Sequence, residues 1–258
     1  MADAGDLFDL TGKVAVITGG AGDIGAAYAR ALCEAGAASV IADLNEAAAI
    51  AAAENLTAKG FKALGVVLDV TSRESATTMA SAAVTAFGGI DILINNAAIM
   101  TDLPRYGLVD MPASEWDRVM SVNLRGPLFC TQAVVESMVA RGGGRIINGL
   151  SAGAFMSSGI YGVSKLALHG LTANLASELG HRGINVNAIA PGLIESPSGF
   201  SSLPKDSPVR DDIAARIPGQ AAGPPEDLIG TMLLLCSNAG KWINGQSICV
   251  DGGWVMRL

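Results

Sequence analysis

The sequence predicts a single doubly wound α/β domain, in which helices cover both faces of a parallel sheet. Short apolar segments alternate with longer segments rich in Ala, Leu, Glu and Arg along nearly all of the 258 residues. This order is typical of parallel strands joined by right-handed crossover helices. The apolar segments are nearly continuous, as expected for strands buried on both faces. No linker or internal repeat divides the chain, so residues 1–258 are interpreted as one domain.

Seven apolar segments are predicted to form the strands of this sheet. In chain order they are Lys13–Thr18, Ala38–Asp43, Lys62–Asp69, Asp91–Asn95, Arg145–Leu150, Ile184–Ala190 and Ser247–Asp251. Segments long enough for crossover helices separate them, the longest being around Ser114–Ala140 and Gly159–His181. Residues 191–227 are irregular and rich in proline and serine. We interpret this stretch as a lid over a pocket, because long irregular segments in compact domains are usually functional or mobile.

The composition of the chain argues against nucleic-acid-binding, membrane-spanning, secreted and metal-binding proteins. A net charge of -7 and a pI near 4.8 argue against a nucleic-acid-binding surface, and the chain has no run of about 18 apolar residues that would indicate a membrane span. The acidic N-terminus lacks the features of a secretory signal, so a cytoplasmic protein is expected. The four cysteines form no CxxC pair and neither histidine lies in an HExxH frame, so no metal site is expected.

The stretch "TGGAGDIG", Thr18–Gly25, has the pattern of a phosphate-binding loop between a strand and a helix. Glycines let the backbone approach a pyrophosphate, and the helix N-terminus offers unpaired N–H groups and a positive dipole. Dinucleotide contacts are therefore predicted at Gly19, Gly22, Asp23, Ile24 and Gly25. An acid at position 23 is unexpected beside phosphates. We interpret Asp23 as the N-cap of the following helix, the alternative being that its charge weakens dinucleotide binding.

Asp43 closes the next predicted strand, 18 residues beyond Gly25. This is near the spacing of the acid that binds the adenine ribose in dinucleotide sites. A carboxylate there accepts hydrogen bonds from the two ribose hydroxyls and repels a 2′-phosphate. Cofactor contacts are therefore predicted at Asp43 and at the next residue, Leu44. Neither Leu44 nor the glycine loop supplies a Lys or Arg that would neutralise such a phosphate. The sequence therefore favours NAD(H) over NADP(H) as the cofactor.

Four further motifs follow the glycine loop. They are "NNAA" at Asn95–Ala98, "YGVSK" at Tyr161–Lys165, "APG" at Ala190–Gly192 and "DGG" at Asp251–Gly253. In their order and spacing, the loop and these motifs resemble the classical short-chain dehydrogenase/reductase family over essentially the whole chain. The resemblance implies a Rossmann-type sheet with the seven strands in the order 3-2-1-4-5-6-7, and a homotetramer.

The resemblance also implies cofactor contacts outside the glycine loop. Contacts with the adenine, the ribose and the nicotinamide end are implied, respectively, at Asp69 and Val70, at Asn95 and Ala97, and at Pro191, Gly192, Ile194 and Ser196. The chain departs from the family pattern at Asp23 and Ala98, where glycine is usual.

Tyr161 and Lys165 are four residues apart, so they share one face of a helix. An ammonium about 4 Å from a phenol is worth up to roughly 4 kcal/mol at an effective dielectric near 20. That interaction lowers the phenol pKa by at most about three units. Tyr161 is therefore predicted to be the general acid/base of a hydride-transfer reaction, and both residues are also expected to contact the cofactor.

The family implies two further catalytic residues. Ser151 matches the serine that orients the substrate oxygen, and Asn123 in "SVNLRG" matches the asparagine that supports a water-mediated proton relay through Lys165. The ten residues from Ser151 to Tyr161 are fewer than is usual in the family. Ser157 and Ser158 also lie in this shortened segment.

The predicted substrate is a neutral, moderately hydrophobic secondary alcohol or ketone. Candidate lining residues are mostly apolar: Met100, Ala152, Phe155, Met156, Leu193, Phe200 and Leu203. Arg105 and Lys205 lie in loops within reach, so an acidic substrate stays open. Two other functions compete with an NAD-dependent alcohol dehydrogenase. An acyl-carrier or acyl-CoA ketoreductase would usually prefer NADP, which Asp43 opposes. A catalytically silent dinucleotide-binding protein would have no reason to keep all four catalytic residues.

Overall fold

The computed structural model describes residues 6–100, 103, 106–196, 208–219 and 222–256, and it confirms the predicted fold class. Among these residues, seven parallel strands form one sheet in the order β3-β2-β1-β4-β5-β6-β7. The strands are β1 (Val14–Thr18), β2 (Ala38–Asp43), β3 (Ala63–Val67), β4 (Ile92–Asn95), β5 (Gly144–Gly149), β6 (Ile184–Pro191) and β7 (Ser247–Val250). Each begins and ends close to its predicted bounds.

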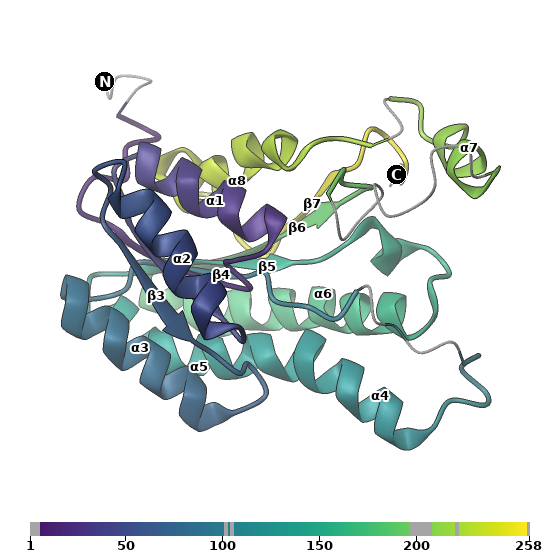
Figure 1. Ribbon diagram of the computed structural model, residues 1–258, viewed down its shortest axis with the longest axis horizontal. Coiled ribbons are helices and arrows are strands. Elements are labelled where there is room, and N and C mark those ends of the chain that lie inside the picture. Colours follow the sequence, from purple (N-terminus) through teal and green to yellow (C-terminus); the bar gives the residue numbers. More distant parts are fainter. Residues whose placement is uncertain (1–5, 101–102, 104–105, 197–207, 220–221, 257–258) are drawn as a thin grey trace.

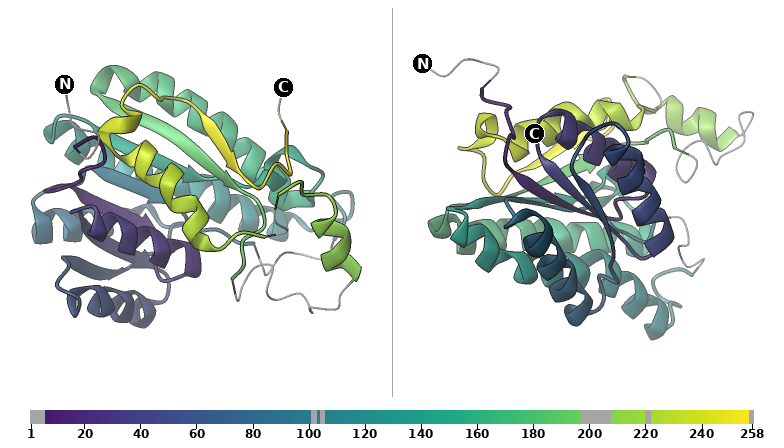
Figure 2. Two further views of the ribbon diagram at one scale, coloured as in Figure 1. Left: turned by 90° about the horizontal axis from the view of Figure 1, so that it is seen from above. Right: turned by 60° about the vertical axis from the view of Figure 1, so that its left-hand side comes forward.

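Helices cover both faces of the sheet (Figures 1 and 2). They are α1 (Asp23–Glu34), α2 (Glu46–Thr57), α3 (Arg73–Phe87), α4 (Ala113–Met120), α5 (Gly126–Ala140), α6 (Gly159–Leu179), α7 (Pro208–Ala214) and α8 (Ile229–Cys236). One face carries α1, α2 and α8, and the other carries α3, α5 and α6. A π-helical turn, Ser121–Arg125, joins α4 to α5, so the long helix predicted around Ser114–Ala140 is one continuous element with a local irregularity.

Burial on both faces explains the continuous apolar pattern of the strands. In β1, Val14 and Val16 pack beneath α3, α5 and α6, whereas Ala15 and Ile17 pack beneath α1, α2 and α8. A strand that contributes to two cores has no position for a polar alternation.

The irregular segment predicted to be a lid is fastened at both ends. Ile194, shortly after β6, forms a parallel bridge with Gly223. The Gly223 N–H donates to the Leu193 carbonyl at 3.1 Å, and the Glu195 N–H donates to the Gly223 carbonyl at 2.9 Å. Between these ends, α7 stands apart from the two helix layers (Figure 1). Two predicted lining residues, Phe200 and Leu203, lie outside the described residues, as do Arg105 and Lys205.

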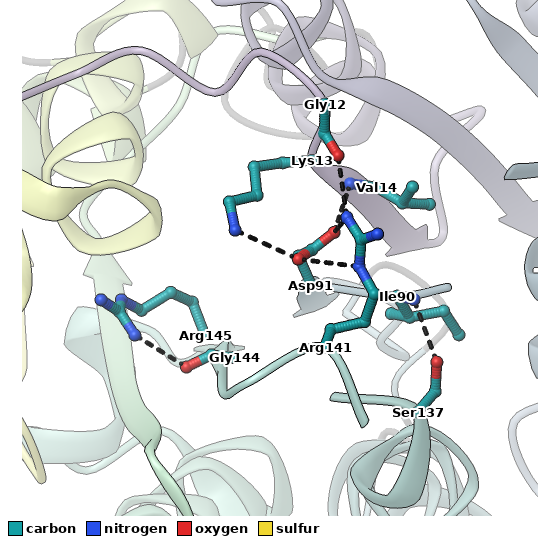
Figure 3. A network of polar contacts seen from close by, with 9 residues as sticks. All are labelled: Gly12, Lys13, Val14, Ile90, Asp91, Ser137, Arg141, Gly144 and Arg145. Carbon is teal, nitrogen blue, oxygen red and sulfur yellow. Dashed lines mark hydrogen bonds and ion pairs between the residues drawn. The ribbon is translucent and has the colours of Figure 1, made fainter. Parts of the chain in front are cut away.

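Asp91 lies at the start of β4, at the end of the sheet opposite the predicted site, and Figure 3 shows the polar groups that contact it. Its side chain is only 4% exposed. One carboxylate oxygen accepts hydrogen bonds from Lys13 Nζ at 3.2 Å and Arg141 Nε at 3.3 Å. The other accepts from the Val14 N–H at 3.0 Å and from Arg141 Nη2 at 2.9 Å. These bonds join the starts of β1 and β4 to the end of α5.

We expect Asp91→Ala to lower the free energy of unfolding by about 2–3 kcal/mol, because the buried Val14 N–H and two cations lose their shared acceptor. The side chains of Lys13 and Arg141 are 47% and 34% exposed and can be rehydrated, which keeps the loss below that of a fully buried ion pair. Urea unfolding measures the difference. The control Asp212→Ala removes an exposed pair with Arg216 and should change the free energy by less than about 0.5 kcal/mol. Equal losses in the two variants would contradict the role given to Asp91.

Candidate active site

A cavity of about 900 Å³ opens at the carboxyl ends of the strands. In this fold the order of the strands reverses between β1 and β4, and crevices form at such switch points. Sixteen predicted site residues lie on its wall: Gly19, Gly22, Asp23, Ile24, Asp43, Leu44, Asp69, Val70, Ala97, Ser151, Tyr161, Lys165, Pro191, Gly192, Ile194 and Ser196. Residues distant in sequence thus meet in one place. Gly25, Asn95 and Asn123 are not part of this wall.

The glycine loop needs glycine for two different reasons. Gly19 has φ +61°, in the left-handed region, and a Cβ there would lie 2.9 Å from Ala97 Cα. At Gly25 a Cβ would overlap the carbonyl oxygen of Gly19. Gly25 therefore lets α1 begin against the loop's own backbone, and it lies behind the surface formed by Gly19 and Gly22.

Asp23 is not the N-cap, so the capping interpretation is wrong by one residue. The helix begins at Asp23 itself, and the N-cap is Gly22, which has no side chain to cap the first turn. An acid in the first turn still interacts favourably with the helix dipole. Because Asp23 lies on the cavity wall, the first turn of α1 reaches the cavity with its own negative charge.

Asp43 lies at the end of β2, where it supports the glycine loop. One carboxylate oxygen accepts the Ala21 N–H at 3.2 Å, and the other accepts the Asn45 N–H at 3.1 Å. A carboxylate has about four acceptor positions, so each oxygen keeps capacity for a ligand hydroxyl. Leu44 beside it is 72% exposed, so this end of the cavity lies at the molecular surface.

A buried polar row runs just beneath the cavity. Thr18 Oγ1 accepts the N–H groups of both Asn96 and Ala97 at 3.0 Å. The Asn95 side-chain amide donates to Asn148 Oδ1 at 2.9 Å, and Asn95 is 2% exposed. Asn96 and Ala97 therefore form the cavity wall at this point, while the Asn95 side chain holds β4 to β5.

Tyr161 and Lys165 lie on one face of α6, beside Ser151 at the end of β5. Lys165 Nζ lies 5.7 Å from the centre of the Tyr161 ring and donates to the Gly149 carbonyl at 2.6 Å. Ser151 Oγ accepts the Gly153 N–H at 3.0 Å and is hydrogen-bonded to Tyr161. Ser151 lies on the cavity wall, and neither Ser157 nor Ser158 does.

The expectation that Lys165 lowers the Tyr161 pKa is wrong for this structure. Burial raises the pKa of Tyr161, and the hydrogen bond with Ser151 opposes this only in part. Burial also lowers the pKa of Lys165 to about 8, which weakens its charge at alkaline pH. The ammonium bonds to the Gly149 carbonyl, and the low-dielectric surroundings disfavour the charged form of both side chains.

Asn123 lies in the π turn and is fully buried. Its amide oxygen accepts the Ile99 N–H at 2.8 Å, and its amide nitrogen donates to the Ile99 carbonyl and to Ser164 Oγ, each at 3.1 Å. Ser164 donates in turn to the Tyr161 carbonyl at 2.7 Å. Asn123 thus connects the loop after β4 to the helical turn that carries Tyr161 and Lys165. Its link to Lys165 through water stays a prediction.

The sequence prediction missed several residues on the cavity wall, among them Arg118 and Tyr28. Arg118 is bound by Glu115, with Nε and Nη2 at 3.1 and 2.9 Å from one carboxylate oxygen. It lies four residues before Val122, another wall residue that the sequence prediction did not include. Among the expected lining residues, Met100 and Leu193 lie on the wall, whereas Ala152, Phe155 and Met156 lie off it.

Neither a metal cluster nor a membrane-spanning element is found in the part of the chain that the structure describes. No group of three His, Cys, Asp or Glu side chains there could hold a metal ion. No helix in the described ranges is long and apolar enough to cross a bilayer.

The sequence is similar to known oxidoreductases along nearly its full length. A family model described as Enoyl-(Acyl carrier protein) reductase matches residues 19–255. The chain is 43% identical over 251 residues to an uncharacterized oxidoreductase of Mycobacterium tuberculosis, covering 97% of this chain and 100% of the relative. It is 38% identical over 254 residues to Dehydrogenase/reductase SDR family member 4 of Bos taurus, covering 96% of this chain and 89% of the relative.

Two solved structures have the same architecture. A gluconate 5-dehydrogenase from Burkholderia cenocepacia, in complex with NADP and tartrate, is 35% identical with a TM-score of 0.92, over 99% of this chain and 100% of that chain. A 7α-hydroxysteroid dehydrogenase complexed with NADH and 7-oxo glycochenodeoxycholic acid is 31% identical with a TM-score of 0.91, over the whole of both chains.

Burial of Lys165 predicts a pH-dependent stability. Its folded-state pKa, about 8, lies below the ordinary value of 10.5, so between these two pH values the unfolded chain binds a proton that the folded chain does not. Stability contributed through this group therefore rises with pH. The stability of Lys165→Met does not change through this group, whereas that of the wild type rises. We therefore expect the unfolding free energy of Lys165→Met, relative to wild type, to be about 2 kcal/mol lower at about pH 10 than at about pH 7.

Denaturant unfolding at the two pH values measures this change. The exposed Lys59 provides the control, because Lys59→Met should differ from wild type by the same amount at both. A Lys165→Met difference that is also independent of pH would contradict the prediction.

Proposed function

The chain belongs to the short-chain dehydrogenase/reductase family, because the matched model and relatives that carry this family name cover nearly all of it, and we propose that it interconverts a secondary alcohol and a ketone with NAD(H). The observation that carries the proposal is the meeting of Ser151, Tyr161 and Lys165 with the glycine loop on one cavity wall. A proton donor, an orienting hydroxyl and a dinucleotide cradle are the parts that this reaction needs.

In the proposed reaction, Ser151, Tyr161 and Lys165 each have a separate role in proton transfer. In the proposed reduction, Ser151 holds the substrate carbonyl oxygen and Tyr161 donates its phenol proton to that oxygen. In alcohol oxidation the same phenol oxygen removes the hydroxyl proton. Lys165, whose pKa of about 8 lies near neutrality, returns or takes up a proton at Tyr161, with Asn123 supporting the relay. The nicotinamide, when bound, supplies the hydride for reduction and accepts it in oxidation.

The cavity fits a dinucleotide. Gly19 and Gly22 present backbone without side chains, and nothing lies closer than 3.5 Å to the position that a Cβ on Gly22 would take. The first turn of α1 reaches the cavity beside them, which suits a pyrophosphate. Asp69 and Val70 would hold the adenine, and Ser196 the nicotinamide carboxamide.

Asp43 supports NAD(H) as the preferred cofactor. Its carboxylate lies on the cavity wall beside the exposed Leu44, where a 2′-phosphate would meet a negative charge. The gluconate dehydrogenase with a similar fold was crystallised with NADP, so cofactor preference differs among proteins of this architecture and depends on such local residues.

A 3-oxoacyl-type ketoreductase is the second candidate, because the description of the matched family model names an acyl-carrier substrate, although it names reduction of an enoyl double bond and not of a ketone. The mostly apolar wall favours a neutral, moderately hydrophobic substrate in either case. A panel of secondary alcohols with NAD, and of ketones and 3-oxoacyl thioesters with NADH, tests both functions through the absorbance of NADH. Turnover of simple alcohols supports the first candidate, turnover of thioesters alone supports the second, and binding of NADH without any turnover would indicate a silent dinucleotide-binding protein.

We expect Tyr161→Phe to lower kcat by about 10²–10⁴-fold, the usual contribution of a positioned acid/base. NADH affinity, read by fluorescence titration, should change little, because the ring remains. Tyr106→Phe, at an exposed tyrosine, is the matched control and should keep wild-type activity. A Tyr161→Phe variant with normal turnover would show that the proposed mechanism is wrong.

We expect NADH to bind more tightly than NADPH, and Asp43→Asn to reduce that preference by about tenfold, since one charge facing the 2′-phosphate is worth about 1–2 kcal/mol near a protein surface. Asparagine keeps the shape of the side chain and one of the two oxygens that accept the N–H groups of Ala21 and Asn45. Dissociation constants for both dinucleotides measure the ratio. The exposed Glu46 nearby serves as the control, and Glu46→Gln should leave the ratio unchanged. Tighter binding of NADPH by the wild type would contradict the role of Asp43.

The homotetramer and the cytoplasmic location stay predictions from the family resemblance and composition. The same holds for the interpretation of residues 1–258 as a single domain.

A further inference from the structure

The short segment between Ser151 and Tyr161 is closed by a compact turn. Ser151 is followed by the 3₁₀ turn Ala152–Phe155, and α6 begins at Gly159. The Gly153 N–H in this turn donates to Ser151 Oγ at 3.0 Å. The orientation of the Ser151 hydroxyl therefore depends on where the turn lies.

Ser158 fastens this turn to the start of α6. Its hydroxyl contacts the Gly153 carbonyl at 2.5 Å and the Met156 carbonyl at 3.3 Å. Gly153 thus accepts from Ser158 through its carbonyl and donates to Ser151 through its N–H. One residue of the turn connects the two hydroxyl groups.

Two glycines make room for the Ser158 hydroxyl. A Cβ at Gly162 would lie 2.6 Å from Ser158 Oγ and 2.7 Å from the Gly153 oxygen. A Cβ at Gly153 would lie 3.0 Å from Ser158 Oγ. The contact requires glycine at position 162, and it is tight at position 153. Ser157, the neighbouring serine, is exposed.

We propose that Ser158 is a positioning residue for the reaction, acting through Gly153 on Ser151 and so on the Ser151–Tyr161 pair. The inference rests on the proposed function, which makes that pair the site of proton transfer. In a segment shorter than is usual in the family, the Ser158–Gly153 contact holds the turn in place, and the turn holds the hydroxyl that bonds to Tyr161. Ser158 itself is not on the cavity wall.

Ser158→Ala, with Ser157→Ala as the matched control, tests the proposal by kinetics. We expect Ser158→Ala to lower kcat about tenfold or more, with KM and the NADH dissociation constant within about twofold of wild type. The pH at which alcohol oxidation reaches half its maximum rate should rise, because Tyr161 loses the bond that favours its ionised form. Ser157→Ala should match wild type in each measurement.

A second measurement needs no activity. The chain has three tyrosines, so the ¹³Cζ resonance of Tyr161 can be assigned by its loss in Tyr161→Phe. We expect Ser158→Ala to shift this resonance in the same direction as Ser151→Ala, and Ser157→Ala to leave it in place. If Ser158→Ala does not bind NADH and has not folded, Ser158→Cys keeps the volume but only a weak donor, and the same shift is expected.

The outcomes separate this inference from the proposed function. A Ser158→Ala protein with the kinetics and the Tyr161 resonance of Ser157→Ala would overturn the role of Ser158 and leave the proposed reaction standing. A wild type without turnover would contradict the proposed function, while the resonance would still decide whether Ser158 positions the Ser151–Tyr161 pair.

Discussion

A row of buried hydrogen bonds across the carboxyl ends of the strands fixes the geometry on which the cavity depends. Thr18 at the end of β1 holds the loop after β4, Asn95 holds β4 to β5, and Asn148 donates to Thr172 Oγ1 on α6 at 2.9 Å. A slip of one residue between these strands would turn every apolar side chain to the wrong face and break the row. Because α6 also carries Tyr161 and Lys165, the bonds that set the strand register also set the height of the reactive side chains above the sheet.

The low dielectric around this site shifts the pKa values of Tyr161 and Lys165 in opposite directions, and both shifts favour the neutral side chain. Burial raises the pKa of the phenol and lowers that of the ammonium, so both neutral forms are favoured. In the proposed reaction, a neutral phenol is ready to donate a proton near neutral pH, and a lysine with a pKa of about 8 exchanges protons in the same range. Burial therefore favours proton donation by Tyr161 in the proposed reaction. The hydrogen bond with Ser151 opposes the rise in the Tyr161 pKa in part.

Local patterns predicted the fold and most of the wall, but not the details that depend on tertiary packing. Continuous apolar segments predicted all seven strands, and the spacing from Gly25 to Asp43 placed that acid correctly on the cavity wall. The start of α1 was misjudged by one residue, because the extended backbone of Gly22 takes the N-cap position and the capping preference of Asp23 does not decide it. The pKa of Tyr161 was misjudged because the spacing to Lys165 says nothing about burial or about the Gly149 carbonyl that binds the ammonium.

The exposed position of Leu44 has a consequence for how such a protein diversifies. Asp43 and Leu44 lie where β2 leaves the core, and Leu44 is 72% exposed, whereas Gly19 and Gly25 of the loop are packed against backbone atoms. A substitution at Leu44 leaves the packing beneath the sheet untouched, whereas one at Asp43 also removes the acceptor of the Ala21 N–H in the glycine loop. Under the proposed function, the choice between the two dinucleotides can therefore be redesigned at Leu44 independently of folding. The proposed reacting residues Ser151, Tyr161 and Lys165 lie on other elements, so under the proposed function the electron donor can be exchanged without altering them.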